Sequence, residues 1–100
     1  MKIDLNLLDA RDLLAKKEIS SLELTKIYLD NIKNGEELNC YNTVATEHAL
    51  TEAEKSDIRR KEGKHKSPFD GIPIGIKDLF CTNNIRTTAS SRILSNFVPT

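Results

Sequence analysis

The chain has 100 residues, with 15 Lys and Arg against 15 Asp and Glu, 38% hydrophobic residues and no Trp. Its zero formal charge excludes a protein that works by bulk electrostatic attraction to nucleic acid or to an anionic membrane. A domain of this length fills its core with large side chains, yet the chain has only three Phe and two Tyr. We therefore expect the chain to be a piece of a larger domain.

Several other classes of protein are excluded by pattern. The longest run of apolar, glycine and proline residues, 71–76, is far shorter than the roughly 20 residues that span a bilayer. The first residues include no long apolar region of a signal peptide. Cys40 and Cys81 lie too far apart for a metal knuckle, and we expect both to be buried small apolar residues in the reducing cytosol. His48 and His65 are isolated, so we expect surface positions and no metal site.

Residues 1–66 are predicted to be helical. A first helix is indicated by leucines that recur at helical spacing, with Asp4 or Asn6 placed to cap it. These leucines are Leu5, Leu8, Leu13 and Leu14.

A second helix is predicted to begin at Ser20 or Ser21. Ser20 and Glu23 fit the S-x-x-E capping box, in which each side chain accepts a hydrogen bond from a backbone N–H that the helix leaves unpaired. Gly35 is a suitable stop. The apolar face of this helix comprises Leu24, Ile27, Tyr28 and Ile32.

Residues 36–46 form either a short strand or an extended connector, because their side chains alternate in character. A third helix is predicted from about Glu47 to Glu62, with acidic residues early and basic residues late, and Gly63 ends it. Its apolar face is thin, which indicates a peripheral helix; it comprises Ala49, Leu50, Ala53 and Ile58. We expect Tyr28 and Tyr41 to be packing residues.

The basic run at 59–66 has two interpretations. It is either a contact for nucleic acid or the solvated end of the third helix with its loop. No aromatic residue is interleaved with it for base stacking.

Residues 72–77 are predicted to form a strand with isoleucines on one face, so the fold class is α/β. The opposite face offers Pro73 and Gly75 before Lys77, and glycine in a strand often marks the close approach of a ligand or another backbone. Lys77 could therefore lie in a tight, partly dry site that favours the neutral amine, which is a usable general base. The alternative is a lysine at the end of a strand whose ammonium reaches water.

The stretch Arg86-Thr-Thr-Ala-Ser-Ser91 groups hydroxyls around one cation. It could bind a small polar substrate or an anion. It could equally be a loop followed by a helix cap at Ser90 or Ser91.

At Lys77 the sequence resembles the amidase signature family. The segment Asp70-Gly-Ile-Pro-Ile-Gly-Ile-Lys-Asp-Leu-Phe-Cys-Thr82 and the following Arg86–Ser91 stretch match its N-terminal part. Further matches are the opening of the second helix, the connector Leu38-Asn-Cys-Tyr-Asn-Thr-Val44 and the exit Ser95-Asn-Phe-Val-Pro99. The continuation Phe80-Cys81-Thr82 favours the tRNA-dependent amidotransferase branch of the family, in its A subunit.

The resemblance implies a fold and a reaction. The fold would be an α/β/α amidase with a large mixed central sheet, of which residues 1–100 form the N-terminal part: helices over 1–66, then the first strand and the active-site segment over 70–100. Lys77 would be the lysine of a Ser–cis-Ser–Lys triad that hydrolyses glutamine to glutamate and ammonia. The ammonia would convert misacylated Glu-tRNA(Gln) or Asp-tRNA(Asn) to the amide. The partners would be a B subunit, which uses ATP and Mg²⁺, and a small C subunit; the chain itself would hold no cofactor.

One departure from the family pattern is decisive. The glycine-rich loops that hold the two triad serines do not occur in the sequence, and Ser90-Ser91 lacks the flanking glycines. We therefore expect the isolated chain to be inactive as a glutaminase. We also expect it to be poorly ordered, because most of the sheet would be missing and the strand from residue 72 would have unpaired backbone and an uncovered isoleucine face. Three alternatives stay open: an amidase acting on another small amide, a non-catalytic remnant or partner-binding fragment, and a nucleic-acid-binding module built on residues 59–66.

Overall fold

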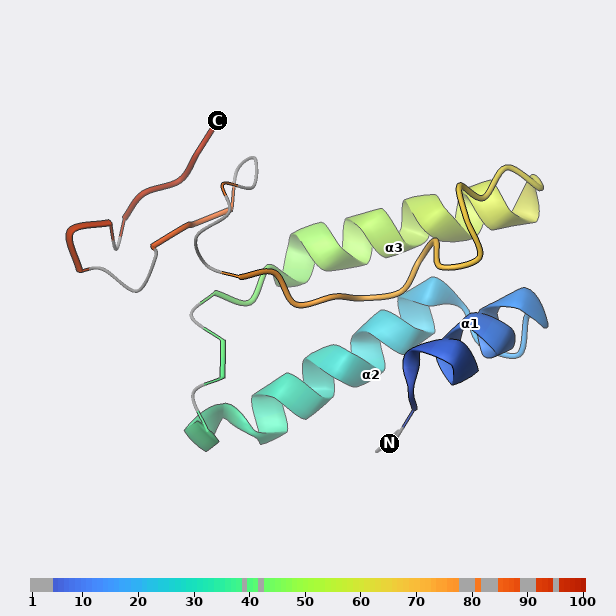
Figure 1. Ribbon diagram of the computed structural model, residues 1–100, viewed down its shortest axis with the longest axis horizontal. Helices are drawn as coiled ribbons and strands as arrows, with labels where there is room; N and C mark the ends of the chain where they lie inside the picture. The colour runs from blue at the N-terminus through green and yellow to red at the C-terminus, as the bar shows by residue number, and fades with distance from the viewer. Residues whose placement is uncertain are drawn as a thin grey trace. The chain divides into compact units, whose positions relative to one another are not determined.

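The computed structural model describes residues 5–38, 40–41, 43–77, 81, 85–88, 92–94 and 96–100. Its α-helices are α1 (Leu7–Ala15), α2 (Ser21–Asn34) and α3 (Thr46–Lys61), and its short 3₁₀ turns are η1 (Glu36–Leu38) and η2 (Arg92–Leu94) (Figure 1). The chain divides into two compact units. We call Met1–Gly35 with Thr46–Pro73 the helical unit, and Glu36–Ala45 with Ile74–Thr100 the Lys77 unit.

The first helix begins at the cap that the sequence offered. Asn6 is the N-cap of α1, and its side chain accepts a hydrogen bond from the Asp9 amide at 2.8 Å. The helix ends in a left-handed residue, because Lys17 has φ 57° and the Glu18 amide donates back to the Leu13 carbonyl at 3.0 Å. This is a Schellman ending, in which glycine is the usual left-handed residue.

The capping box predicted for the second helix is confirmed. The Ser20 hydroxyl accepts from the Glu23 amide at 3.0 Å, and the Glu23 carboxylate accepts from the Ser20 amide at 3.3 Å. Gly35 is the C-cap, so the predicted stop is also confirmed. Both ends of α2 are therefore set by local sequence.

The third helix follows a connector, residues 40–45, whose described part contains no strand. The prediction of a short strand or an extended connector over residues 36–46 is wrong in its first part, because Glu36–Leu38 form the 3₁₀ turn η1. The described part of residues 40–45 agrees with a connector rather than a strand. Gly63, whose φ is 71°, terminates the chain's helical course after α3. The Lys64 amide donates a hydrogen bond to the Arg59 carbonyl at 2.7 Å. This second Schellman ending has the glycine that the geometry favours.

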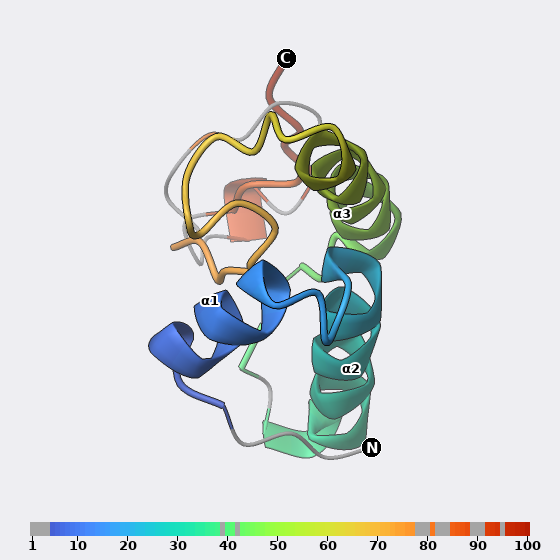
Figure 2. The same ribbon diagram turned by 90° about the vertical axis from the view of Figure 1, so that its right-hand side faces the viewer.

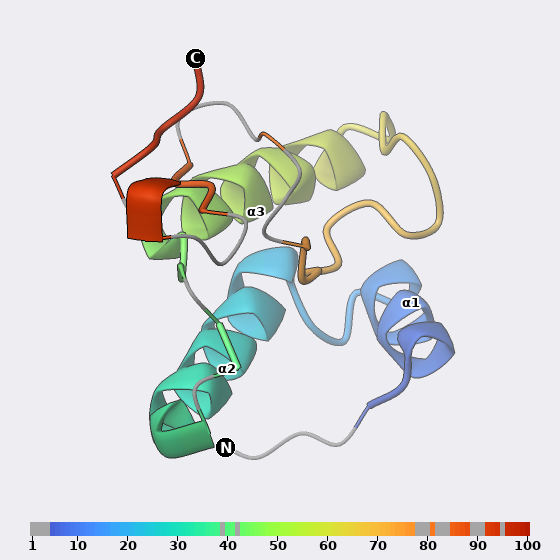
Figure 3. The ribbon, with the colours of Figure 1, turned by 60° about the vertical axis from the view of Figure 1, so that its left-hand side comes forward.

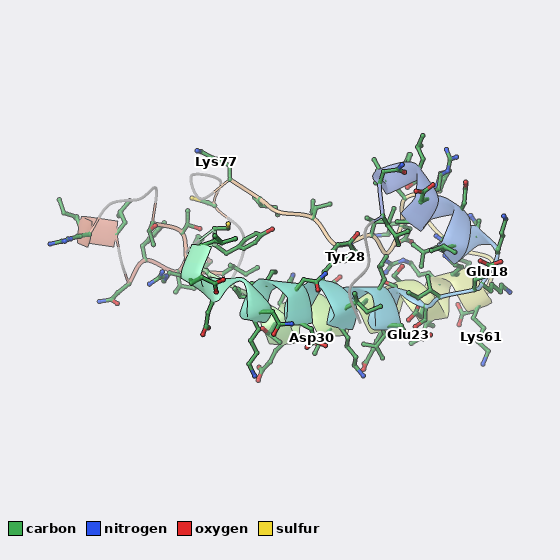
Figure 4. The ribbon with its side chains drawn as sticks, turned by 90° about the horizontal axis from the view of Figure 1, so that it is seen from below. Glu18, Glu23, Tyr28, Asp30, Lys61 and Lys77 are labelled. Carbon is green, nitrogen blue, oxygen red and sulfur yellow. The ribbon has the colours of Figure 1, made fainter. Side chains whose placement is uncertain are left out.

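The core of the helical unit is small and lies between α1 and α2. Helices α1 and α2 lie side by side (Figure 2). Ala10 and Leu14 of α1 pack with Leu24 of α2. Partly buried residues that complete this core are Leu5, Ile19, Tyr28 and Ile72. In Figure 4, Tyr28 lies on the opposite side of α2 from Glu23 and Asp30, which face outward. The packing role predicted for Tyr28 is confirmed.

Helix α3 packs against α2 (Figure 3). Ala53 and Ser56 are its buried positions, whereas Ile58 is 57% exposed. The prediction that Ile58 belongs to the buried face is wrong. At about 100° per residue, Ile58 lies on the side of the helix away from Ala53 and Ser56. A polar residue, Ser56, rather than a large apolar side chain, is therefore one of the two buried positions of α3.

The predicted strand is absent from the structure, since residues 72–77 have no strand pairing. A strand exists only when a neighbour pairs with its backbone groups, and no described residue pairs with this segment as a ladder. Its isoleucines separate: Ile72 packs on the helical core, while Ile74 is 76% exposed and Ile76 is 56% exposed. An uncovered isoleucine face is what we expected of the chain on its own.

Candidate active-site segment

The segment that leads to Lys77 begins at a buried carboxylate, Asp70, whose side chain is only 7% exposed. Arg59 of α3 donates to it from Nε at 2.9 Å and from Nη2 at 2.7 Å. The Ser56 hydroxyl and the Lys66 amide each donate to it at 3.0 Å. The hydrogen bonds from Arg59, followed by those from Lys66 and Ser56, hold the pKa of Asp70 well below its usual range.

Gly71 is fixed beside this carboxylate. Its carbonyl accepts a hydrogen bond from the Ser21 hydroxyl at 2.6 Å, and its φ is 97°. A Cβ atom at this position would lie 2.5 Å from the Ser56 hydroxyl oxygen and 2.9 Å from that of Ser21. Both the backbone angle and the space therefore require glycine.

A second carboxylate, which belongs to α3, binds the start of α2. Asp57 accepts hydrogen bonds from the Ser21 amide at 2.7 Å and from the Leu22 amide at 3.0 Å. These are amides that a helix N-terminus leaves unpaired, and the negative charge favours that end of the helix dipole. Together, Ser21, Ser56, Asp57, Arg59, Asp70 and Gly71 form what we call the Asp70 network.

This network was not predicted from the sequence. A signal was present, because Ser56 lies three residues after Ala53 and shares its helical face. A serine on the inward face of a helix needs a hydrogen-bond partner, and the aspartate before Gly71 supplies one.

One of the two interpretations of the basic run at 59–66 was the solvated end of the third helix with its loop. The structure agrees with this interpretation only in part. Arg59 pairs with Asp70, and Arg60 Nη2 donates to the Asp70 carbonyl at 2.9 Å. The later basic residues of the run are exposed; they are Lys61, Lys64, His65 and Lys66. Its two arginines thus fold onto the loop that precedes Gly71.

Lys77 is exposed, and its side chain projects outward in Figure 4. The sequence left two environments open for Lys77, a tight and partly dry site or a strand end whose ammonium reaches water. Among the described residues, the ammonium reaches water, as in the second. Within the described part of the Lys77 unit, the side chain is not enclosed in a dry pocket. Its catalytic role stays a prediction.

Two other stretches of the Lys77 unit meet the connector 40–45. A Cβ atom at Gly75 would lie 3.6 Å from Cε1 of Tyr41. Arg86 Nε donates to the Thr43 hydroxyl at 3.1 Å. The connector therefore contacts the hydroxyl-rich stretch and lies near the segment that ends at Lys77.

The hydroxyl-rich stretch has a structural role where it is described. Thr87 and Thr88 are 5% and 6% exposed, and the Thr87 amide donates to the Phe97 carbonyl at 2.9 Å. Ser90 and Ser91, the predicted alternatives for a helix cap, lie outside the described residues.

The cysteines differ from expectation, because both Cys40 and Cys81 are exposed. Neither is among the residues of the α1–α2 core, so the prediction of buried small apolar residues is wrong. His48 and His65 are exposed, as predicted. Among the described residues, no three His, Cys, Asp or Glu side chains are grouped to hold a metal ion. No described helix has the length and apolar character needed to cross a membrane.

Comparison with known proteins gives the segment a context. The family model described as Amidase matches residues 23–100. Two proteins named as the A subunit of glutamyl-tRNA(Gln) amidotransferase, from Zymomonas mobilis and Rhodospirillum rubrum, are each 48% identical over 96 residues, which is 96% of the chain. The protein of the same name from Ehrlichia canis is 47% identical over 98 residues.

The chain spans about a fifth of the length of these relatives, 19% or 20% in each case. The family match includes α3, the Asp70–Gly71 turn and the whole segment that ends at Lys77. It covers more than three-quarters of the chain, so the chain belongs to the amidase family.

Proposed function

We propose that the chain is part of the A subunit of a glutamine-dependent tRNA amidotransferase and supplies the lysine of its glutaminase site. The observation that supports this most is the 47–48% identity, along nearly the whole chain, with relatives named as the A subunit of glutamyl-tRNA(Gln) amidotransferase. The ammonia released from glutamine would amidate misacylated Glu-tRNA(Gln) or Asp-tRNA(Asn). The B and C subunits, with ATP and Mg²⁺ used by the B subunit, would complete a cytosolic enzyme.

Lys77 is proposed as the base of this reaction. It accepts a proton, through a bridging serine, from a nucleophilic serine that attacks the amide carbon of glutamine. The C–N bond breaks, ammonia leaves, and water hydrolyses the acyl-enzyme to glutamate. Neither serine motif occurs in the sequence, so both serines come from elsewhere in the domain.

The exposed state of Lys77 fits a site completed by other parts of an amidase domain. A lysine acts as a base only when it is neutral, and a dry environment favours that form. Ile74 and Ile76 are also exposed, as the first strand of a large mixed sheet would be before its neighbours cover it. Pairing with that sheet would bury these isoleucines and turn residues 72–77 into the predicted strand.

The test uses a complete amidase, by which we mean this chain followed by the rest of an amidase domain. The remainder comes from the native reading frame or from the Zymomonas mobilis relative. Lys77→Ala should reduce ammonia release from glutamine to below a few per cent of the parent while leaving the fold intact. Lys61→Ala, at another exposed lysine, is the matched control.

Retention of more than a few per cent of activity in Lys77→Ala would rule out Lys77 as the base. The substrate is tested separately, by comparing glutamine with free small amides and by adding the B and C subunits with ATP and misacylated tRNA. Faster turnover of a small amide than of glutamine, with no transamidation, would favour the alternative amidase. The 100-residue chain alone should release no ammonia, because it lacks both serine motifs.

A further inference from the structure

The segment of residues 72–77 begins at a turn that two helices hold in place. The Gly71 carbonyl accepts a hydrogen bond from the Ser21 hydroxyl, in the first turn of α2, at 2.6 Å. The Asp70 carboxylate accepts from Nε and Nη2 of Arg59, on α3, at 2.9 Å and 2.7 Å. All four residues belong to the helical unit, so this unit itself supplies the groups that fix the start of the segment.

Ser21 uses its backbone and its side chain for two different contacts. Its backbone amide donates to the Asp57 carboxylate at 2.7 Å and ties α2 to α3. Its hydroxyl donates to the Gly71 carbonyl, and the whole residue is only 1% exposed. The N-cap of α2 is Ser20, not Ser21. The Ser21 hydroxyl is therefore not needed to begin the helix, and it acts on the turn before residue 72.

A fixed start decides which way Lys77 points once residues 72–77 form a strand. Side chains alternate between the two faces of a strand, and a slip of one residue in its pairing exchanges the faces. Ile72 packs on the helical core, and Lys77, five residues later, lies on the opposite face of the strand. A segment released at Gly71 is free to pair one residue out of register, which would turn the amine to the wrong side.

We propose that Ser21 is a positioning residue for Lys77, because its bond to Gly71 sets the register in which the segment joins the sheet of the complete amidase. The inference rests on the proposed function, in which the Lys77 amine lies within hydrogen-bond reach of a serine. The rearrangement expected of residues 72–77 leaves this bond in place, since both of its partners lie outside those residues. A displacement of about 1 Å in a catalytic group can cost about a hundredfold in rate.

The kinetic test compares two neighbouring serines in the complete amidase. Ser21→Ala removes the bond to Gly71 and keeps the backbone bond to Asp57. It should lower kcat for glutamine about tenfold and leave KM within about twofold, because only the placement of the base changes. Ser20→Ala is the matched control: it removes the cap of α2, keeps the bond to Gly71, and should lower stability with kcat within about twofold of the parent. Equal losses of kcat in the two variants would show that stability explains the effect and would overturn the proposal.

A second readout follows the base without glutamine. A sulfonyl fluoride modifies an activated serine: the serine oxygen bonds to sulfur, fluoride leaves, and the proton passes to the base. In Ser21→Ala the rate of this modification should fall by about the same factor as kcat, because the same lysine activates the serine. An unchanged rate of modification beside a lower kcat would place the defect elsewhere and overturn the positioning role.

Amide hydrogen exchange separates this proposal from the proposed function. Exchange at residues 72–77 should accelerate about tenfold in Ser21→Ala and not in Ser20→Ala, because only the first variant releases the start of the segment. Parental kcat and parental exchange in Ser21→Ala would overturn the positioning role, even if Lys77→Ala is inactive. Full activity in Lys77→Ala would instead overturn the proposed function, and the role of Ser21 with it.

Discussion

The two units of the chain differ in the pairing of their polar groups and in the burial of their apolar groups. In the helical unit, the carboxylates of Asp57 and Asp70 are paired inside the unit, and Ile72 packs on the α1–α2 core. In the Lys77 unit, Ile74, Ile76 and Lys77 are all exposed. Ile74 follows Ile72 by two residues, so the change occurs within a short length of chain.

This difference indicates where each unit obtains its stability. The helical unit combines helix caps with a buried ion pair, and both are complete within its own residues. Most of the described large apolar side chains of the Lys77 unit are exposed, so we expect its final structure to depend on what packs against it. Ser21 aside, we expect substitutions to have large effects on stability in the first unit and effects on catalysis in the second.

The largest stability effect is expected at Gly71. Gly71→Ala should lower the stability of the helical unit by about 2–4 kcal/mol, because it combines an unfavourable positive φ with a collision at Ser56 and Ser21. The control is Gly63→Ala, where φ is also positive but nothing lies within 4 Å of the added carbon. Amide exchange of α2 and α3 in the complete amidase measures both. Equal losses would show that the backbone angle alone matters.

Asp70→Asn should cost about 2–3 kcal/mol in the same measurement, because Arg59 loses the charge of its partner inside a mostly buried site. Glu52→Gln, which breaks the exposed ion pair with Lys55 at 3.1 Å on the same helix, should have no measurable effect. A loss as small as that of Glu52→Gln would mean that the Asp70 network does not stabilise the unit.

Acid should weaken the helical unit through the same carboxylate. The pKa of Asp70 is lowered in the folded state, chiefly by hydrogen bonds from Arg59, so the unfolded chain binds protons more readily. The contribution is complete above about pH 5, roughly one unit above the unfolded pKa of about 3.9, and is lost progressively as the pH falls from there toward the lowered value. Exchange rates corrected for their intrinsic pH dependence should show this loss in the parent and a weaker one in Asp70→Asn.

Substitution of neighbouring isoleucines compares the two units directly. Ile72→Ala should destabilise the helical unit by about 1–2 kcal/mol, since Ile72 packs partly on its core. In the 100-residue chain, Ile74→Ala should change stability by less than about 0.5 kcal/mol, because the side chain is exposed. In the complete amidase, Ile74→Ala should become costly if the rest of the domain covers it. An equal effect in both contexts would contradict the expected burial.

A small gain in stability is expected at the end of α1. Lys17→Gly should raise the stability of the helical unit by about 0.5–1 kcal/mol, because Lys17 has φ 57° in a position that glycine adopts without steric cost. Lys16→Gly is the matched control, since Lys16 has an ordinary right-handed conformation and glycine there should lower stability. A loss of stability in Lys17→Gly would show that its side chain makes a stabilising contact.

The sequence by itself determined the local features of this protein. Asn6, the Ser20–Glu23 capping box, Gly35 and Gly63 act within a few residues, so their patterns predicted where helices begin and end. The motif around Lys77 also indicated the amidase family, which the family comparison confirms. Each of these inferences depends on residues that are close along the chain.

Tertiary structure alone decided which polar residues are buried and which apolar residues are not. Ser56 and Asp70 are 14 residues apart, and Asp57 is 36 residues from the helix start that it caps, so no local pattern could pair them. Ile74 has the alternation of a core strand, yet it is exposed because a strand needs a neighbour that pairs with it. Burial and pairing are properties of two surfaces brought together, and one segment of sequence describes only one of them.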